Sequence, residues 1–135
     1  MSEVEEGASE TVLEVRGLVS AFDTEHGLLR AVDQVSFSVE RGRSLGIVGE
    51  SGCGKSVTAM SLIHLLPQPA GVILEGEVIF KGEDLRKVSD KRMREVRGGE
   101  IGTIFQEPMT ALNPVHRIGR QVSAVFRLPK KMSRK

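Results

Sequence analysis

Apolar and polar residues alternate along several stretches in the first half of the chain. Val35, Phe37 and Val39 alternate with serines, and this period of two predicts a strand with one buried face. Further strands are predicted within Thr11–Phe22 and over Glu77–Phe80. Residues typical of turns separate these strands at 23–27, 41–43 and 81–82. The chain is therefore expected to begin with a β-rich region.

Three apolar runs lack this alternation. Leu45–Val48 is short and uniformly apolar, as expected for a central parallel strand that is covered on both faces. Ile101–Phe105 predicts another strand. Val57–Leu66 is apolar on nearly every side, which predicts a buried helix that Pro67 and Pro69 end. Strands and helices then follow one another, which indicates α/β units.

The last third of the chain predicts two helices on either side of a loop. Ser89 is a suitable N-cap for a polar helix that ends near Gly98–Gly99. Residues Gln106–Pro114 are rich in turn formers and predict a loop. A second helix, ended by Pro129, is predicted by an apolar stripe at Ile118, Val122, Val125 and Phe126.

Composition limits the class of protein. The chain has 135 residues, 39% hydrophobic and 27% charged, which is typical of one soluble globular domain. No apolar run approaches the roughly 20 residues that a membrane helix needs. The acidic start of the chain lacks the apolar core of a secretory signal, so a cytoplasmic protein is expected. Cys53 is the only cysteine, which excludes an intrachain disulfide.

Charge is unevenly distributed along the chain. Residues 1–80 carry 5 Lys/Arg and 12 Asp/Glu, whereas residues 81–135 carry 14 and 6. A basic half is one signature of nucleic-acid binding. Here no stacking aromatics lie between the basic residues, and several fall in one helical stretch, Lys87–Arg97. A solvated helix face explains them better, and no nucleic-acid partner is expected.

The run Gly49–Ser56 (GESGCGKS) matches the pattern G-x-x-x-x-G-K-[ST] of phosphate-binding loops, and it lies between a predicted strand and a predicted helix. Glycines allow backbone N–H groups to approach phosphate oxygens, and the helix directs its positive end toward the same anion. Lys55 is expected to reach the β- and γ-phosphates, and Ser56 to bind Mg²⁺. A glycine-rich turn before a core helix would explain the glycines but not the adjacent Lys55 and Ser56.

Gln106 follows a predicted strand at the edge of the expected nucleotide site. Its neutral amide could bind Mg²⁺ or orient water, and it could leave the site without exposing a charge. By chemistry alone an ordinary loop glutamine explains the residue equally well.

Four segments, LEVRGLVSAF, AVDQVSFSVERGRSLGIVGESGCGKSVTAMSLIHLLP, GEVIFKGEDL and IGTIFQEPMTALNPVHRIGRQ, together resemble the N-terminal part of an ABC-transporter ATPase subunit of the dipeptide, oligopeptide and nickel import group. They cover nearly all of residues 11–127, in order. The resemblance implies an α/β P-loop NTPase fold, in which an antiparallel β subdomain precedes the start of a parallel-sheet core. It also implies a flexible acidic tail at 1–10, a partial nucleotide-binding domain at 11–128, and a basic tail at 129–135.

The resemblance implies ATP and Mg²⁺ as cofactors. It places the adenine-stacking aromatic at Phe22, although a core aromatic is the alternative there. Lys55 and Gln106 would act in catalysis, and Ser56 and Gln106 would bind the metal. The expected nucleotide-binding residues are Phe22, Gly49, Glu50, Ser51, Gly52, Cys53, Gly54, Lys55, Ser56 and Val57. His64 lies in the predicted apolar helix and is expected to pack there rather than to act as a ligand.

Partners also follow from the resemblance. They are the transmembrane permease subunits, whose coupling helices would lie near Glu107–Pro114, a second ATPase subunit in a homodimer or heterodimer, and, indirectly, an extracytoplasmic solute-binding protein. The protein would lie on the cytoplasmic face of the inner membrane. The transported solute, a peptide, nickel or another compound, stays open.

Several motifs of the family have no match in the chain. No apolar run ends in the Asp-Glu pair of a Walker B motif, and no LSGGQ-like signature, D-loop or switch histidine occurs. Phosphoryl transfer would then lack its base and part of its electrostatic stabilisation. The 135 residues alone are therefore expected to lack ATPase activity, to fold marginally and to represent a fragment. A nucleotide-binding module without catalysis is the alternative function.

Other P-loop enzymes fit less well. A GTPase should contain N-K-x-D and D-x-x-G motifs, and neither occurs. A small-molecule kinase would lack the FQEPMTALNP segment.

Overall fold

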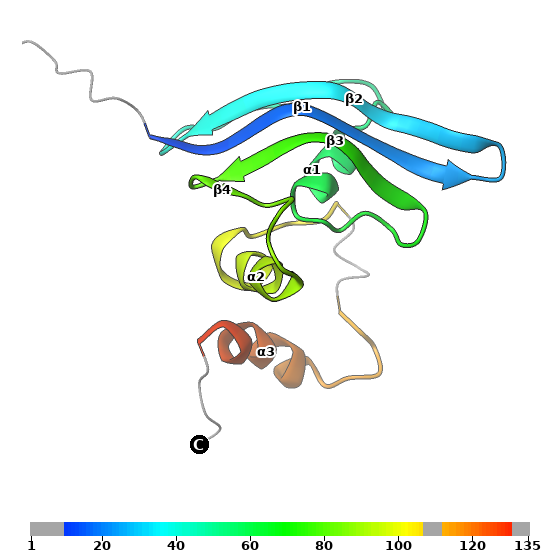
Figure 1. The fold of residues 1–135 in the computed structure, drawn as a ribbon. Coiled ribbons are helices and arrows are strands. Elements are labelled where there is room, and N and C mark those ends of the chain that lie inside the picture. Colours follow the sequence, from blue (N-terminus) through cyan, green and yellow to red (C-terminus); the bar gives the residue numbers. More distant parts are fainter. Residues whose placement is uncertain (1–9, 107–111, 131–135) are drawn as a thin grey trace, which may run out of the picture. The chain divides into compact units, whose positions relative to one another are not determined.

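The computed structural model describes residues 10–106 and 112–130 (Figure 1). The chain divides into two compact units, residues 1–88 and 89–135. Most of the expected acidic tail at 1–10, and residues 131–135 of the expected basic tail, lie outside the described residues.

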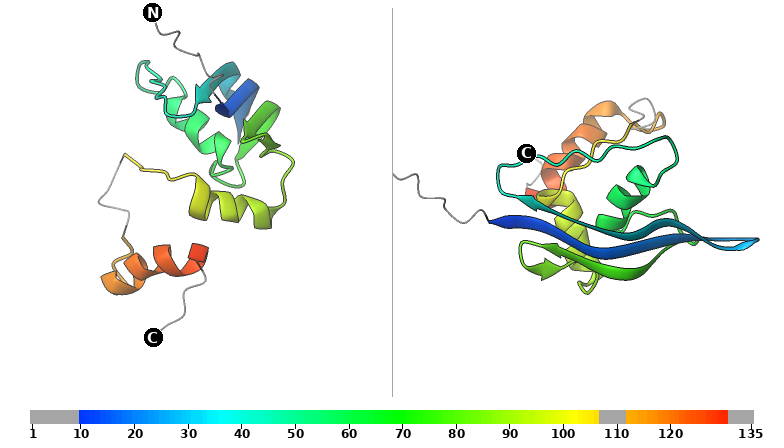
Figure 2. Two further views of the ribbon diagram at one scale, coloured as in Figure 1. Left: turned by 90° about the vertical axis from the view of Figure 1, so that its left-hand side faces the viewer. Right: turned by 90° about the horizontal axis from the view of Figure 1, so that it is seen from above.

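The first unit is built on a four-stranded antiparallel sheet with the strand order β2-β1-β3-β4. Figures 1 and 2 show the long hairpin of β1 and β2 beside β3. The strands predicted within Thr11–Phe22, at Val35–Val39 and over Glu77–Phe80 are confirmed, and each is longer than expected. The strands are β1 (Thr11–Thr24), β2 (Gly27–Glu40), β3 (Gly71–Phe80) and β4 (Glu83–Asp84).

The centre of this sheet forms most of the core. β1 hydrogen-bonds to strands on both sides, and Val15, Leu18 and Val19 are almost fully buried. The edge strand β2 shows the predicted alternation, with Ser36 exposed between half-buried neighbours. Gly76 of β3 has a φ of +97°, and a Cβ there would lie 2.6 Å from the backbone oxygen of Gly17. The close approach of β1 and β3 at this point therefore requires glycine.

Helix α1 (Lys55–Leu62) lies against one face of the sheet (Figure 1). The prediction of a helix buried on nearly every side is wrong, since Ser56 and Ala59 are exposed and the buried residues of α1 are the polar Thr58 and Ser61. The Ser61 hydroxyl lies 2.8 Å from that of Ser20 in β1 and donates a bond to Val57 O. Paired hydroxyls thus occupy the contact between helix and sheet.

Helix α1 also ends earlier than predicted, at Leu62 rather than at the prolines. His64 has a φ of +52° and donates its N–H to Ser61 O, while the N–H of Leu65 bonds to Met60 O. These two bonds form a Schellman cap with His64 in the left-handed position. His64 is therefore a helix-ending residue and not, as predicted, a residue within the helix.

The second unit contains α2 (Asp90–Glu95), a π-helical turn η1 (Val96–Glu100) and α3 (Ile118–Lys130). The N-cap prediction is confirmed, since the Ser89 hydroxyl accepts from the N–H of Arg92 at 3.2 Å. Helix α3 continues through Pro129, so the prediction that proline ends it is wrong by one residue. In the described part of the chain no helix is long and apolar enough to span a membrane.

Two predicted strands are not formed. The described backbone of Leu45–Val48 and of Ile101–Phe105 has no strand pairing. Their side chains are correspondingly exposed, with 92% of Val48 and 99% of Ile104 accessible. Both segments have the composition of a buried strand, but a strand exists only where a neighbour takes up its N–H and C=O groups.

Candidate functional site

The phosphate-loop residues Gly49–Ser56 connect the extended segment 44–48 to the first turn of α1. The helix begins at Lys55, two residues before the predicted start, so Lys55, Ser56 and Val57 form its first turn. Its N-cap is Gly54, with a φ of +89° and no side-chain hydrogen bond to the helix. The N–H groups of the first turn are thus left without a capping side chain, as a site for an anion requires.

Two glycines of the loop lie close to neighbouring atoms. A Cβ on Gly54 would lie 2.3 Å from the backbone oxygen of Ala31 in β2. A Cβ on Gly49 would lie 2.5 Å from the Sγ of Cys53. The loop therefore packs directly on strand β2 at Gly54, where the backbone leaves no room for a side chain, whereas the contact at Gly49 is with the end of the Cys53 side chain.

Lys55 folds back across this loop. Its Nζ donates to the backbone oxygens of Gly49 and Glu50, at 2.8 and 2.7 Å, and lies 3.4 Å from the Sγ of Cys53. The backbone oxygens of the loop thus hold the ammonium group within the loop. Phosphate oxygens compete well for a cation held by backbone carbonyls, because hydrogen bonds between two charged groups are the stronger kind.

The residues present fit a magnesium nucleotide. The Ser56 side chain is exposed in the first turn of α1, where its hydroxyl is free to meet a metal ion next to a bound phosphate. Glycines, lysine and hydroxyl together supply the donors that a triphosphate with Mg²⁺ needs. The individual roles of these residues stay predictions.

Phe22 lies near the end of β1, where it pairs with Leu29 of β2 and Gly71 of β3 and is half-buried. The placement leaves part of the ring accessible for stacking, and the stacking role stays a prediction. Gln106 belongs to the second unit and is exposed. Its role at the nucleotide site therefore also stays a prediction, and Glu107 lies outside the described residues.

An apolar depression of about 360 Å³ lies beside the loop. Phe37 and Val35 of β2 line one side, Leu45–Val48 the other, and Lys55 and Cys53 border it. Within the described residues of the first unit, the loop is thus open to solvent on the side of this depression.

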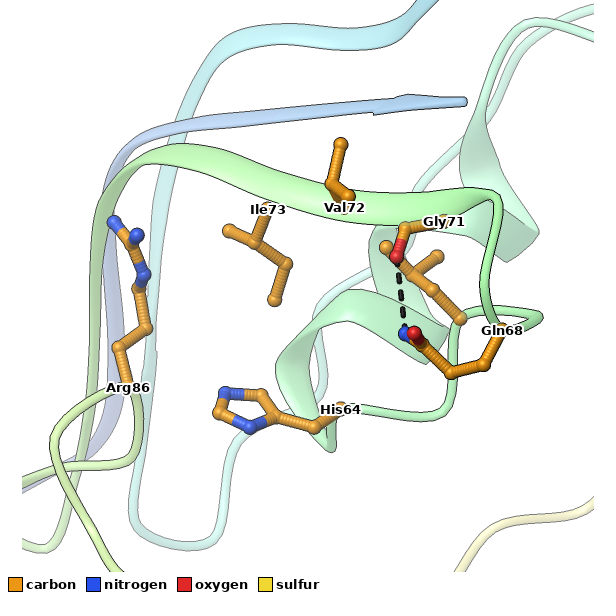
Figure 3. A pocket seen from close by; sticks show the side chains of 7 residues that line it. His64, Gln68, Gly71, Val72, Ile73 and Arg86 are labelled. Carbon is orange, nitrogen blue, oxygen red and sulfur yellow. Dashed lines mark hydrogen bonds between the residues drawn. The ribbon is translucent and has the colours of Figure 1, made fainter. Parts of the chain in front are cut away.

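A second depression, of about 380 Å³, lies between the loop after α1 and β3 (Figure 3). His64, Ile73 and Arg86 line it, together with Gln68. Gln68 donates to Gly71 O at 3.0 Å, and the Arg86 guanidinium donates to Gly76 O. These polar side chains form hydrogen bonds with the backbone of β3. We therefore assign a structural role to the residues that line the depression.

One bridge in the second unit escaped prediction. The side-chain amide of Gln121 in α3 binds the backbone of Asn113 and His116 by three hydrogen bonds. The Asn113-Pro114 pair is a recognisable turn signal. No periodic signal, however, links a glutamine to a turn eight residues earlier.

A glycine-rich loop around a lysine, ahead of an uncapped helix, defines a P-loop nucleotide-binding fold. The family model described as ABC transporter matches residues 32–134, and the chain belongs to this family. Its fold is the N-terminal part of the P-loop NTPase domain of that family, as the sequence predicted.

Named relatives are similar over nearly the whole chain. A probable peptide ABC transporter ATP-binding protein of Sinorhizobium fredii is 49% identical over 93% of the chain and 38% of the relative. The oligopeptide transport ATP-binding protein OppD of Bacillus subtilis is 46% identical over 91% and 34%. The dipeptide transport ATP-binding protein DppD of the same organism is 48% identical over 93% and 38%. The chain thus spans less than two-fifths of the length of these relatives.

Proposed function

We propose that the protein containing this chain is the ATP-binding subunit of an ABC importer for peptides, and that loop 49–56 binds the phosphates of ATP with Mg²⁺. The observation that supports this most directly is the placement of Lys55 inside the glycine loop, at the start of an uncapped helix. A helix N-terminus, a lysine and a hydroxyl converge there, which is the arrangement that stabilises a triphosphate.

Each residue has a defined task in this proposal. Lys55 exchanges its backbone acceptors for β- and γ-phosphate oxygens, and Ser56 binds the metal ion. Gln106 completes the metal shell and responds to the state of the nucleotide. Phe22 stacks on the adenine ring through its accessible face.

The solute and partners rest on family membership and on the relatives. Their names specify peptide, oligopeptide or dipeptide transport, so we propose a peptide as the solute. The partners would be transmembrane permease subunits, a second ATPase subunit and, indirectly, a solute-binding protein. The subunit would lie on the cytoplasmic face of the membrane, with Glu107–Pro114 toward the permease.

Nucleotide binding is tested with Lys55→Ala. Removing charge-assisted hydrogen bonds to the phosphates should weaken MgATP binding by roughly 10- to 100-fold in titration calorimetry. Lys91→Ala, which removes a lysine from α2, is the matched control and should leave the dissociation constant unchanged. Equal affinity of Lys55→Ala and the unaltered protein would contradict the proposal.

A second function, nucleotide binding without turnover, applies to the 135 residues taken alone. Since no Walker B or signature sequence occurs among them, we propose that they bind MgATP but do not hydrolyse it. Phosphate release is the measurement. Turnover that Lys55→Ala abolishes would show that the chain contains its own catalytic base.

A further inference from the structure

The side chain of Gln121 hydrogen-bonds to the turn that precedes α3. The Oε1 of Gln121 accepts from the N–H of Asn113 at 2.8 Å, and its Nε2 donates to Asn113 O and to His116 O, each at 2.8 Å. Both ends of the amide are used, so a flipped amide would oppose like groups at all three contacts. The orientation of Gln121 is thereby determined by its partners.

Two further hydrogen bonds lie within the turn itself. The Oδ1 of Asn113 accepts from the N–H of Val115 at 2.9 Å, and Asn113 O accepts from the N–H of His116 at 3.2 Å. These bonds shape residues 113–116 locally. The side-chain amide of Gln121 connects that shape to helix α3.

Burial does not hold this turn in place. Val115 is 84% exposed and Ile118 is 64% exposed, and Leu112 is half exposed. An exposed segment without core contacts normally samples many conformations. Among the described residues, three hydrogen bonds from the half-buried amide of Gln121 hold this exposed turn.

The turn also has a defined place in the chain. It begins seven positions after Gln106 and overlaps the end of Glu107–Pro114, the segment that the proposed function directs toward the permease. A partner that binds here would meet a backbone that is already ordered, and ordering before binding increases affinity.

We propose that Gln121 is a positioning residue for the permease interface: its amide bridge holds residues 113–116 in the form that the permease binds and joins them rigidly to α3. The inference rests on the proposed function, since it requires a permease as the partner. Gln121 acts through the turn.

The test uses the transporter that contains this sequence. Permease subunits in lipid nanodiscs are titrated with the ATPase subunit, and MgATP affinity is measured separately. Gln121→Met keeps the length of the side chain and removes all three hydrogen bonds. It should weaken permease binding by about tenfold, the equivalent of one or two net hydrogen bonds, and leave the affinity for MgATP within about twofold.

Gln121→Glu keeps the acceptor end of the side chain and replaces the donor end by a second acceptor. It is the variant to use if Gln121→Met does not fold. The carboxylate still accepts from the N–H of Asn113 but opposes the two carbonyl oxygens, so permease binding should weaken in the same direction. Gln68→Met is the matched control, because it removes a glutamine-to-backbone bond in the first unit. It should leave permease binding unchanged.

The outcomes are distinct. Unchanged permease binding by both Gln121 variants overturns the positioning role. A parallel loss of permease and MgATP affinity also overturns it, because it shows general destabilisation. If the unaltered subunit binds MgATP but no permease, the proposed partner itself is wrong, and this inference falls with it.

Discussion

Strand β1 and the segment Leu45–Val48 are both apolar, yet only one of them is a strand. Leu18 in β1 is fully buried between two hydrogen-bonded neighbours. Val48 is 92% exposed, and its segment pairs with no strand in the described part of the chain. Apolar composition supplies the tendency to be buried, but a second strand is needed to satisfy the backbone.

The buried sheet provides stability, whereas the region after β2 contains the residues proposed to bind phosphate. The antiparallel sheet carries the buried side chains of the first unit, whereas the phosphate loop follows directly on the exposed segment. Backbone and lysine hydrogen bonds hold the loop, and not burial. Substitutions at buried positions of the sheet should therefore lower the free energy of unfolding of the isolated chain more than substitutions in the loop region do.

Two leucines test this contrast most strongly. Leu18→Ala removes a fully buried side chain and should lower the free energy of unfolding by about 3 kcal/mol. Leu45→Ala makes the same change at a side chain that is 46% exposed and should cost less than about 1 kcal/mol. Urea unfolding followed by circular dichroism measures both. Equal losses would show that segment 45–48 is packed as firmly as β1.

Two glycine substitutions test the same contrast between the sheet and segment 45–48 in the backbone. Gly76→Ala introduces a Cβ at a φ of +97° and 2.6 Å from backbone atoms of β1. It should therefore lower the free energy of unfolding by about 2–3 kcal/mol. Gly46→Ala places its Cβ where no atom lies within 4 Å, so it should be neutral. Thermal melts of both variants provide the comparison, and a neutral Gly76→Ala would mean that β1 and β3 are less close than described.

The smallest effect concerns the carboxylate of Asp84 in β4. Burial raises the pKa of Asp84, but the hydrogen bond from Lys87 at 2.9 Å and the N–H of Arg86 outweigh it, so the net pKa is lowered. The unfolded chain then binds this proton more readily than the folded one. The resulting stability is present above the unfolded pKa and is lost as the pH falls through the folded pKa.

Asp84→Asn should lower the free energy of unfolding at pH 7 by about 1 kcal/mol and flatten the loss of stability in acid. Denaturant midpoints at pH 7 and below pH 4 provide the readout. Asp33→Asn is the control, because the Asp33 side chain is 65% exposed in its pair with Arg30. An unchanged acid response in Asp84→Asn would remove Asp84 as the cause of the pH dependence.

Periodicity and local signals predicted most elements. Alternation located β2, the Ser89 cap located α2, and an apolar stripe located α3. The ends of α1 were predicted less well. Its start after the left-handed Gly54 and its end at the left-handed His64 follow local backbone geometry more than composition.

The phosphate loop and membership of the ABC transporter family could be read from the sequence alone, because residue types at fixed spacing carry the chemistry of phosphate binding. Tertiary structure alone decided which apolar runs become strands, where Lys55 rests, and that Gln121 orders a turn eight residues away. The physical reason is common to all three. Each depends on a hydrogen-bond partner that residue types and spacing do not identify, because a hydrogen bond exists only when the fold brings both of its groups together.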